Sequence, residues 1–238
     1  MEIRFTNRDL LIFEVIDELG FATIEILKAA CNRLLADDDS STKAIQQRLS
    51  ILKKQNFIKT MHVPDGTIYQ LAFQREHGSF DVPFWQLKHE SFLANLYVLA
   101  RSLQYKVTSS RLCQIQKVEN LKSKSVLKIP DLLIKSDEKP AVFFEYERTD
   151  KSKTRAEQFI KSYQTDEMQA VKVLIYTDSL AVYNVYKPIL LKLIKNLKTF
   201  TATDEKKEIV ILTDNRIKFI YCDKSIFMKN LKSLIIFE

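Results

Sequence analysis

The segment from Ile129 to Arg148 constrains the fold of this chain more than any other stretch. It contains two short apolar runs, rich in branched and aromatic residues, that are separated by a polar turn around Glu138. Such runs, bounded by proline and charged residues, predict two antiparallel strands of a hairpin. With the turn centred on Glu138, Asp131 lies opposite Glu145. Glu147 points to the same face as Glu145, because side chains alternate along a strand.

These three carboxylates would be crowded together, since directly opposed residues have Cβ atoms about 4.5 to 5.5 Å apart. Two like charges about 4 Å apart repel by about 4 kcal/mol at an effective dielectric of about 20. A proton or a cation must relieve that repulsion. A hard divalent cation, Mg²⁺ or Mn²⁺, prefers carboxylate oxygens and leaves positions open for a phosphate. We therefore predict that Asp131, Glu145 and Glu147 form a metal site for phosphodiester chemistry.

The alternative is a solvated hairpin whose acids face water. Four apolar neighbours of the acids favour burial of both faces of the hairpin instead. They are Leu132, Leu133, Phe143 and Phe144.

The pattern Pro130-Asp131, followed by Glu145-Tyr146-Glu147, resembles that of the PD-(D/E)XK restriction-endonuclease-like nucleases. More narrowly, it is similar to the MobC-type relaxases of mobilisable plasmids and the related replication-relaxation proteins. The resemblance covers most of the chain in order of elements. It implies an N-terminal winged helix-turn-helix followed by a nuclease core, in which the Asp and the first Glu hold the metal. Glu147 stands where many such nucleases have lysine, and a carboxylate there would act as a general base or mark a degenerate site.

A helix is predicted from about Phe84 to Leu103, with His89 on its apolar stripe and Glu90 beside it. The pair His89-Glu90 resembles a His-Glu pair of the same relaxase group, which makes both residues secondary candidates for the catalytic site. The alternative for His89 is a histidine with a structural role in the core.

The N-terminal part, residues 1–75, is predicted to be a winged helix-turn-helix domain. Thr6 and Asp9 form a capping-box-like start to a first helix, and Asp65-Gly66 marks a hairpin after the third helix. In such domains the last helix enters the major groove. That helix, with an apolar stripe of Ile45, Leu49 and Leu52, leaves polar residues for DNA, namely Lys43, Gln46, Gln47, Ser50 and Lys54. The alternatives are a merely solvated helix face or a winged helix that binds protein.

The second domain, residues 84–238, is predicted to be a restriction-endonuclease-like mixed-sheet core, so that the whole chain is α/β (α+β). Further strands are expected near 105–108, 112–117, 171–176, 209–213 and 217–222, and helices near 152–163, 182–197 and 225–234. Lys151, Lys153 and Arg155 precede or begin the helix at 152–163, where they would bind phosphate or form a solvated face. We expect Tyr163 to be structural and not a nucleophile.

Composition limits the partners of the chain. Its net charge of +7 favours a polyanionic partner. Three widely separated cysteines predict neither a zinc site nor a disulfide framework. No apolar run approaches the roughly 20 residues needed to span a bilayer, and no signal peptide is apparent, so no membrane partner and a cytoplasmic location are expected.

Together these features predict a Mg²⁺- or Mn²⁺-dependent DNA-nicking endonuclease, a relaxase acting at a plasmid mobilisation origin. Its partners would be double-stranded DNA, at an origin of transfer or an operator-like site, and other relaxosome proteins. The alternative is a non-catalytic winged-helix DNA-binding regulator or a replication or relaxosome accessory protein.

Overall fold

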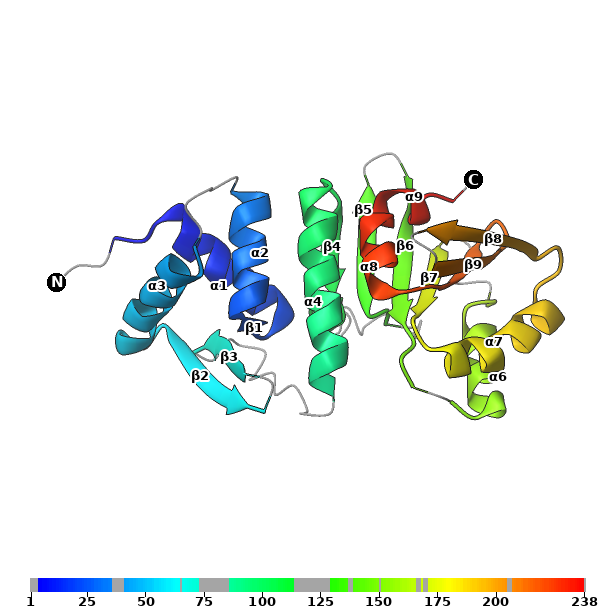
Figure 1. Ribbon diagram of the computed structural model, residues 1–238, viewed down its shortest axis with the longest axis horizontal. Coiled ribbons are helices and arrows are strands. Elements are labelled where there is room, and N and C mark those ends of the chain that lie inside the picture. The colour runs from blue at the N-terminus through cyan, green and yellow to red at the C-terminus, as the bar shows by residue number, and fades with distance from the viewer. Residues whose placement is uncertain are drawn as a thin grey trace, which may run out of the picture. The chain divides into compact units, whose positions relative to one another are not determined.

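The protein is described from a computed structural model and consists of two compact units, Met1–Ser102 and Leu103–Glu238 (Figure 1). The residues that the structure describes are 4–35, 41–64, 66–72, 86–113, 129–136, 139–149, 151–165, 168, 171–204 and 207–237. In these residues each unit contains helices and its own β-sheet, which confirms the predicted α+β class. None of the described helices is both long and apolar enough to span a bilayer.

The N-terminal unit begins with three helices and a small antiparallel sheet of strand order β1-β3-β2. Their bounds are α1 Asn7–Leu19, β1 Ala22–Thr23, α2 Ile24–Leu34, α3 Thr42–Lys54, β2 Ile58–Val63 and β3 Gly66–Leu71. The predicted capping box starts α1, because the Asp9 amide donates to the Thr6 hydroxyl (3.3 Å) and the Thr6 amide to the Asp9 carboxylate (2.7 Å). Gly20 ends α1 with a left-handed φ of 82°, which glycine adopts without a steric cost. The predicted order of three helices and a hairpin is present, whereas the short strand β1 was not predicted.

The last helix of this unit, α4 (Leu87–Ser102), was predicted to open the second domain. It instead packs on α2 and β1, and its Arg101 forms an ion pair of 2.7 Å with Glu14 of α1. The boundary between the two units therefore falls after Ser102 and not within residues 76–83. Much of the circumference of α4 is apolar. The sequence pattern therefore indicates that α4 is buried, but it does not indicate which elements α4 packs against.

The second unit is built on one sheet of strand order β4-β5-β6-β7-β10-β9-β8. The strands are β4 Lys106–Ser109, β5 Leu132–Ser136, β6 Lys139–Tyr146, β7 Lys172–Thr177, β8 Lys198–Asp204, β9 Lys207–Thr213 and β10 Ile217–Tyr221. The helices are α6 Lys153–Ser162, α7 Leu180–Leu193, α8 Lys224–Lys229 and α9 Leu231–Leu234. β6 pairs antiparallel with β5 and parallel with β7, and β7 pairs parallel with β10. The sheet is thus mixed, as predicted.

Helices cover both faces of the sheet around β6. Phe143 points into a core formed with α6 and α7, whereas its neighbour Phe144 points to the other face and meets Phe227 of α8 at 5.8 Å between ring centroids. Of residues 112–117, predicted as a strand, the two that the structure describes differ from that prediction. Leu112 and Cys113 are helical, because the Ser109 hydroxyl caps that turn by accepting from the Leu112 amide (3.4 Å), and residues 114–117 lie outside the described part.

Candidate active site and nucleic-acid interface

The β5-β6 hairpin has the register that the sequence predicts at its acidic end. Leu132 pairs with Phe144 and Leu133 with Phe143. The same register, extended by one residue beyond these pairs, places Asp131 opposite Glu145. The irregularity in this ladder lies between Ile134 and Ser136, near the turn, and does not disturb the acidic end. Asp131 is fixed there because its Oδ2 accepts a hydrogen bond of 2.8 Å from the Tyr146 amide.

Glu145 and Glu147 are buried, with only 6% and 5% of their surfaces exposed. They alternate with Tyr146, so they point to the face of β6 that carries Phe143 and is covered by α6 and α7. The solvated hairpin considered as an alternative is therefore wrong. Burying a carboxylate is costly unless it gains partners inside the protein.

The partner of Glu145 is Tyr163, the residue that follows α6. Its hydroxyl donates a hydrogen bond to Oε1 of Glu145, and its side chain is fully buried. Burial raises the pKa of Tyr163 far above its usual range, and the charges of Glu145, Asp131 and Glu147 raise it further. Tyr163 therefore stays protonated as a donor to Glu145, and Asp131 and Glu147 act on its hydroxyl through their charges.

The partner of Glu147 is Lys151, whose Nζ lies 2.5 Å from Oε1 of Glu147. The same ammonium lies over the ring of Phe159, 4.3 Å from its centroid. Lys151 was predicted as one of three phosphate-binding cations, and here it neutralises a buried acid instead. The other two, Lys153 and Arg155, are exposed at the start of α6.

A second tyrosine, Tyr186 of α7, also borders the acids. Burial raises its pKa, and so do the nearby charges of Glu147 and Glu145. Its hydroxyl is completely buried but lies outside hydrogen-bond geometry with Glu147 or any other described group.

Sequence reasoning predicted that Tyr163 is structural but not that its partner is Glu145, and it missed Tyr186 and the pairing of Lys151 with Glu147. For Tyr163 a signal existed: Ala156, Ile160 and Tyr163 recur at helical spacing, and the first two form the buried stripe of α6. A tyrosine on that stripe brings a hydroxyl into the core, where it needs an acceptor. No comparable pattern indicates which residue pairs with Lys151.

The donor chemistry of the three acids fits Mg²⁺ or Mn²⁺, both of which prefer carboxylate oxygens. Within the described ranges, however, no three His, Cys, Asp or Glu side chains lie close enough together to share one metal ion. The repulsion that the sequence predicts is relieved in this structure by the Lys151 ammonium at Glu147 and the Tyr163 hydroxyl at Glu145.

His89 and Glu90, the secondary catalytic candidates, lie on α4 and therefore belong to the N-terminal unit. Nδ1 of His89 is 3.2 Å from Oε1 of Glu90, and both side chains are partly buried. The structure thus brings these two residues together, while Asp131, Glu145 and Glu147 gather in the second unit.

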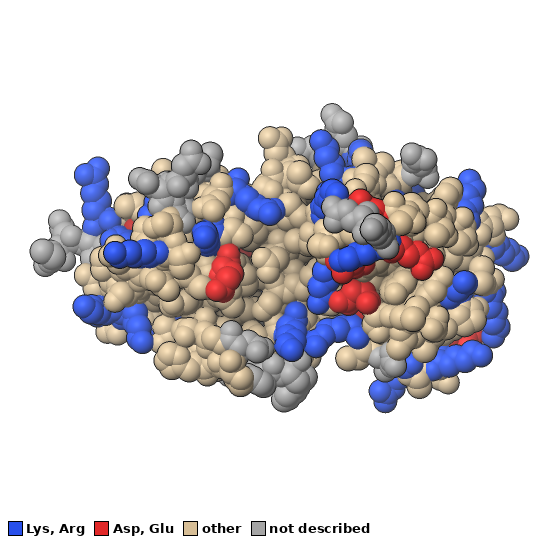
Figure 2. Space-filling view, in the orientation of Figure 1, with Lys and Arg blue, Asp and Glu red and all other residues tan. Residues whose placement is uncertain are grey.

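The face of α3 that was predicted to contact DNA is exposed. The α3 stripe of Ile45, Leu49 and Leu52 is buried, as predicted. The five polar candidates are all exposed, namely Lys43, Gln46, Gln47, Ser50 and Lys54. Figure 2 shows Lys and Arg side chains distributed over the face in view, with acidic side chains between some of them.

Arg48, which flanks this face of α3, has a structural role that the sequence did not reveal. Its Nε and Nη2 each lie 2.6 Å from a carboxylate oxygen of Asp9, and Nη2 also donates to the carbonyl of Arg4 (3.3 Å). Burial alone would raise the pKa of Asp9, but the hydrogen bonds from Arg48 and Thr6 outweigh it and lower that pKa. Arg48 therefore ties α3 to the start of α1.

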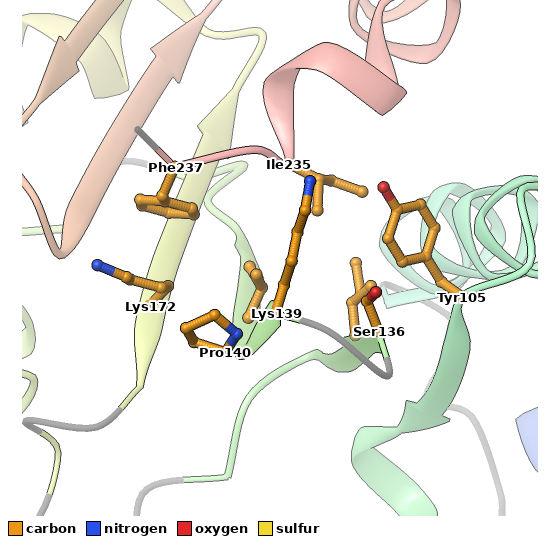
Figure 3. Close-up of a pocket in the computed structure, with 9 residues that line it drawn as sticks. Tyr105, Ser136, Lys139, Pro140, Lys172, Ile235 and Phe237 are labelled. Carbon is orange, nitrogen blue, oxygen red and sulfur yellow. The ribbon is translucent and has the colours of Figure 1, made fainter.

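A pocket of about 280 Å³ lies at the turn end of the β5-β6 hairpin, away from the acids (Figure 3). Ser136 and Lys139 line it together with Tyr105, and Lys172 and Phe237 border it. The Lys172 ammonium donates to the carbonyl of Asn215 and lies 5.8 Å from the ring centroid of Phe237. None of the predicted site residues lines this pocket, so it is separate from the acidic cluster.

Comparison with known proteins yields no relative from which a function could be transferred. No protein family, no curated protein and no solved structure matches this chain. The functional argument therefore rests on the acidic cluster of the second unit and on the exposed face of α3.

Proposed function

We propose that this protein is a divalent-metal-dependent DNA endonuclease that nicks one strand at a site selected by its N-terminal unit. The observation that carries the proposal is the burial of Glu145 and Glu147 on the strand next to Asp131, whose carboxylate is held at the same end of the hairpin by the Tyr146 amide. Buried acids that shift the pKa values of neighbouring groups are characteristic of functional sites, because a purely structural core would have apolar residues at these positions.

To hold Mg²⁺ or Mn²⁺, the side chains of Asp131, Glu145 and Glu147 would have to move closer together than they lie in this structure. The bound ion would then polarise the phosphate and offset developing negative charge. The chain's own residues support that arrangement. The Tyr163 hydroxyl fixes the carboxylate of Glu145, and the Lys151 ammonium offsets the charge of Glu147. Lys153 and Arg155, exposed next to this cluster in the sequence, are suited to bind DNA phosphates.

The N-terminal unit supports site selection. Its order of three helices followed by a hairpin is that of a winged helix-turn-helix, in which the third helix reads the major groove. On α3, exposed glutamines suit base edges and exposed lysines suit phosphates. The resemblance of the acidic motif to the MobC-type relaxases suggests a plasmid mobilisation origin as the target and relaxosome proteins as partners.

A second candidate function is a non-catalytic DNA-binding regulator or replication accessory protein. One observation favours it: each of the three acids has a protein partner, and no three described acids are placed to share an ion. In that case the acidic cluster would only support the fold. The exposed face of α3 and other exposed lysines and arginines would bind DNA.

Incubation with supercoiled DNA carrying an origin of transfer and with Mg²⁺ or Mn²⁺ distinguishes the two functions. The proposal predicts nicked circles from the wild type and none from Asp131→Asn or Glu145→Gln. Glu208→Gln, which removes an exposed acid of β9, is the matched control and should nick like the wild type. Equal nicking by all four proteins would reject the assigned acids. Absence of nicking by all four, together with salt-sensitive DNA binding, would support the regulator.

A further inference from the structure

Among the described residues, β8 forms one edge of the second unit's sheet (Figure 1). In the described part of the chain its one sheet partner is β9, and the residues from Lys198 to Thr203 are all exposed. The ladder with β9 runs without a bulge from Lys198 opposite Thr213 to Asp204 opposite Lys207. Edge strands are usually blunted by proline, by bulges or by central charges, and β8 has none of these between its two ends.

The sequence of β8 is complementary to itself when it is read in the opposite direction. We propose that two copies of this chain pair through β8, antiparallel, about a two-fold axis at Thr201. In this register Lys198 of each copy lies opposite Asp204 of the other, and Phe200 lies opposite Ala202. Each pairing occurs twice, because a two-fold interface uses the same patch of both subunits.

The two faces of β8 are each consistent with that register. Side chains alternate along the strand, so Lys198, Phe200, Ala202 and Asp204 share one face. Phe200 is 53% exposed, and packing on Ala202 of the second copy would remove part of this ring from water. On the other face three threonines meet threonines, and such cross-strand pairs are favourable.

Other registers lose this complementarity. A parallel pairing in register would set lysine against lysine and aspartate against aspartate at its two ends. An antiparallel pairing shifted by two residues would remove both ion pairs, and a slip of one residue would bring the opposite faces together. Within its own chain Asp204 lies 3.5 Å from Lys229 and 3.4 Å from Asn230, yet its side chain remains 30% exposed and so accessible to Lys198 of the second copy.

Disulfide trapping tests both the pairing and its register in the full-length chain. In a Cys113→Ser background, which removes the one partly exposed cysteine, Thr201→Cys should form a covalent dimer on mild oxidation. The two Cβ atoms on the axis would be about 4.5 to 5.5 Å apart, close enough for a disulfide after a small adjustment. Thr199→Cys alone should form no covalent dimer, because its two cysteines would be about 14 Å apart at about 3.4 Å per residue. The double variant Thr199→Cys/Thr203→Cys should again form a covalent dimer.

Sedimentation of unlinked protein provides the second measurement. Wild type should dimerise in a concentration-dependent manner, and Thr201→Lys, which opposes two lysines at the axis, should raise the dimer dissociation constant at least about tenfold. Thr203→Lys is the matched control and should not, because its lysine would face Thr199 of the second copy. A wild type that stays monomeric at high micromolar concentration would overturn the proposal. So would equal disulfide trapping of Thr201→Cys and Thr199→Cys.

Discussion

Tyr163 donates a hydrogen bond to Glu145 inside the core of the second unit, where both side chains are buried. Burial raises the pKa of Tyr163 most, Glu145 raises it further, and the charges of Asp131 and Glu147 add to that increase. Glu145 thus has a hydroxyl as its hydrogen-bond donor in this structure, where a metal ion was expected from the sequence. The proposed chemistry and the stability of this unit therefore depend on the same few groups.

The hydroxyl of Tyr163 should matter to stability, and that of Tyr186 should not. Tyr163→Phe leaves a buried carboxylate without its donor and should lower the free energy of unfolding by about 1 to 3 kcal/mol. Tyr186→Phe removes a hydroxyl that lies outside ordinary hydrogen-bond geometry with the described residues, so it should change stability little. Denaturant unfolding of the two variants measures the difference. Equal destabilisation would show that the hydrogen bond to Glu145 is not what stabilises the site.

Lys151 should stabilise the fold, whereas its neighbour Lys153 should not. Lys151→Met preserves much of the packing on Phe159 but leaves Glu147 without its cation, which should lower the unfolding free energy by about 1 to 3 kcal/mol. Lys153→Met changes an exposed side chain and should stay within about 0.5 kcal/mol of the wild type. Thermal and denaturant unfolding of both variants test this, and a Lys151→Met protein as stable as Lys153→Met would contradict it.

The Asp9–Arg48 pair should make the N-terminal unit acid-sensitive. The pKa of Asp9 is lowered in the folded protein, so its stabilising effect is complete above the ordinary value of 3.8 and disappears as the pH falls through the lower folded value. Asp9→Asn should lose about 3 kcal/mol at pH 7, because Arg48 is left without its carboxylate.

Denaturant unfolding of wild type and Asp9→Asn across the pH range measures this effect. The difference in unfolding free energy between the two proteins should be constant at neutral pH and should shrink below pH 3.8. Glu25→Gln, at an exposed acid of α2, is the control and should change stability little at any pH. A difference between wild type and Asp9→Asn that grows with acidity would refute the assigned role.

The exposed lysines of α3 should contribute to DNA affinity through phosphates. Lys43→Gln and Lys54→Gln should each weaken binding and reduce the slope of log affinity against log salt by about 1. Lys28→Gln, at an exposed lysine of α2, is the control and should leave that slope unchanged. Fluorescence anisotropy at several salt concentrations measures the slopes. Identical slopes for all three variants would remove α3 from the proposed DNA interface.

The hairpin and its register could be predicted because they depend on local rules. Alternation along β5 and β6 and the position of the polar turn were enough to place Asp131 opposite Glu145. The capping box of α1 and the buried stripe of α3 followed in the same way from short-range spacing.

Tertiary partners were not predictable from those rules. The contacts of Tyr163 with Glu145 and of Arg48 with Asp9 join residues 18 and 39 positions apart, and no spacing pattern links them. β8 was missed because it is exposed on both faces and so lacks the apolar alternation that marks a half-buried strand. The placement of α4 was missed because its apolar surface fits more than one neighbour.

Calorimetric titration with Mn²⁺ tests the central claim most directly, because it needs neither the correct DNA nor a partner protein. The account predicts saturable binding by the wild type and by Glu208→Gln, and loss of that binding in Asp131→Asn and Glu145→Gln, with all four proteins folded by circular dichroism. Wild-type protein that takes up no Mn²⁺, or binding that persists unchanged in both acid variants, would contradict it.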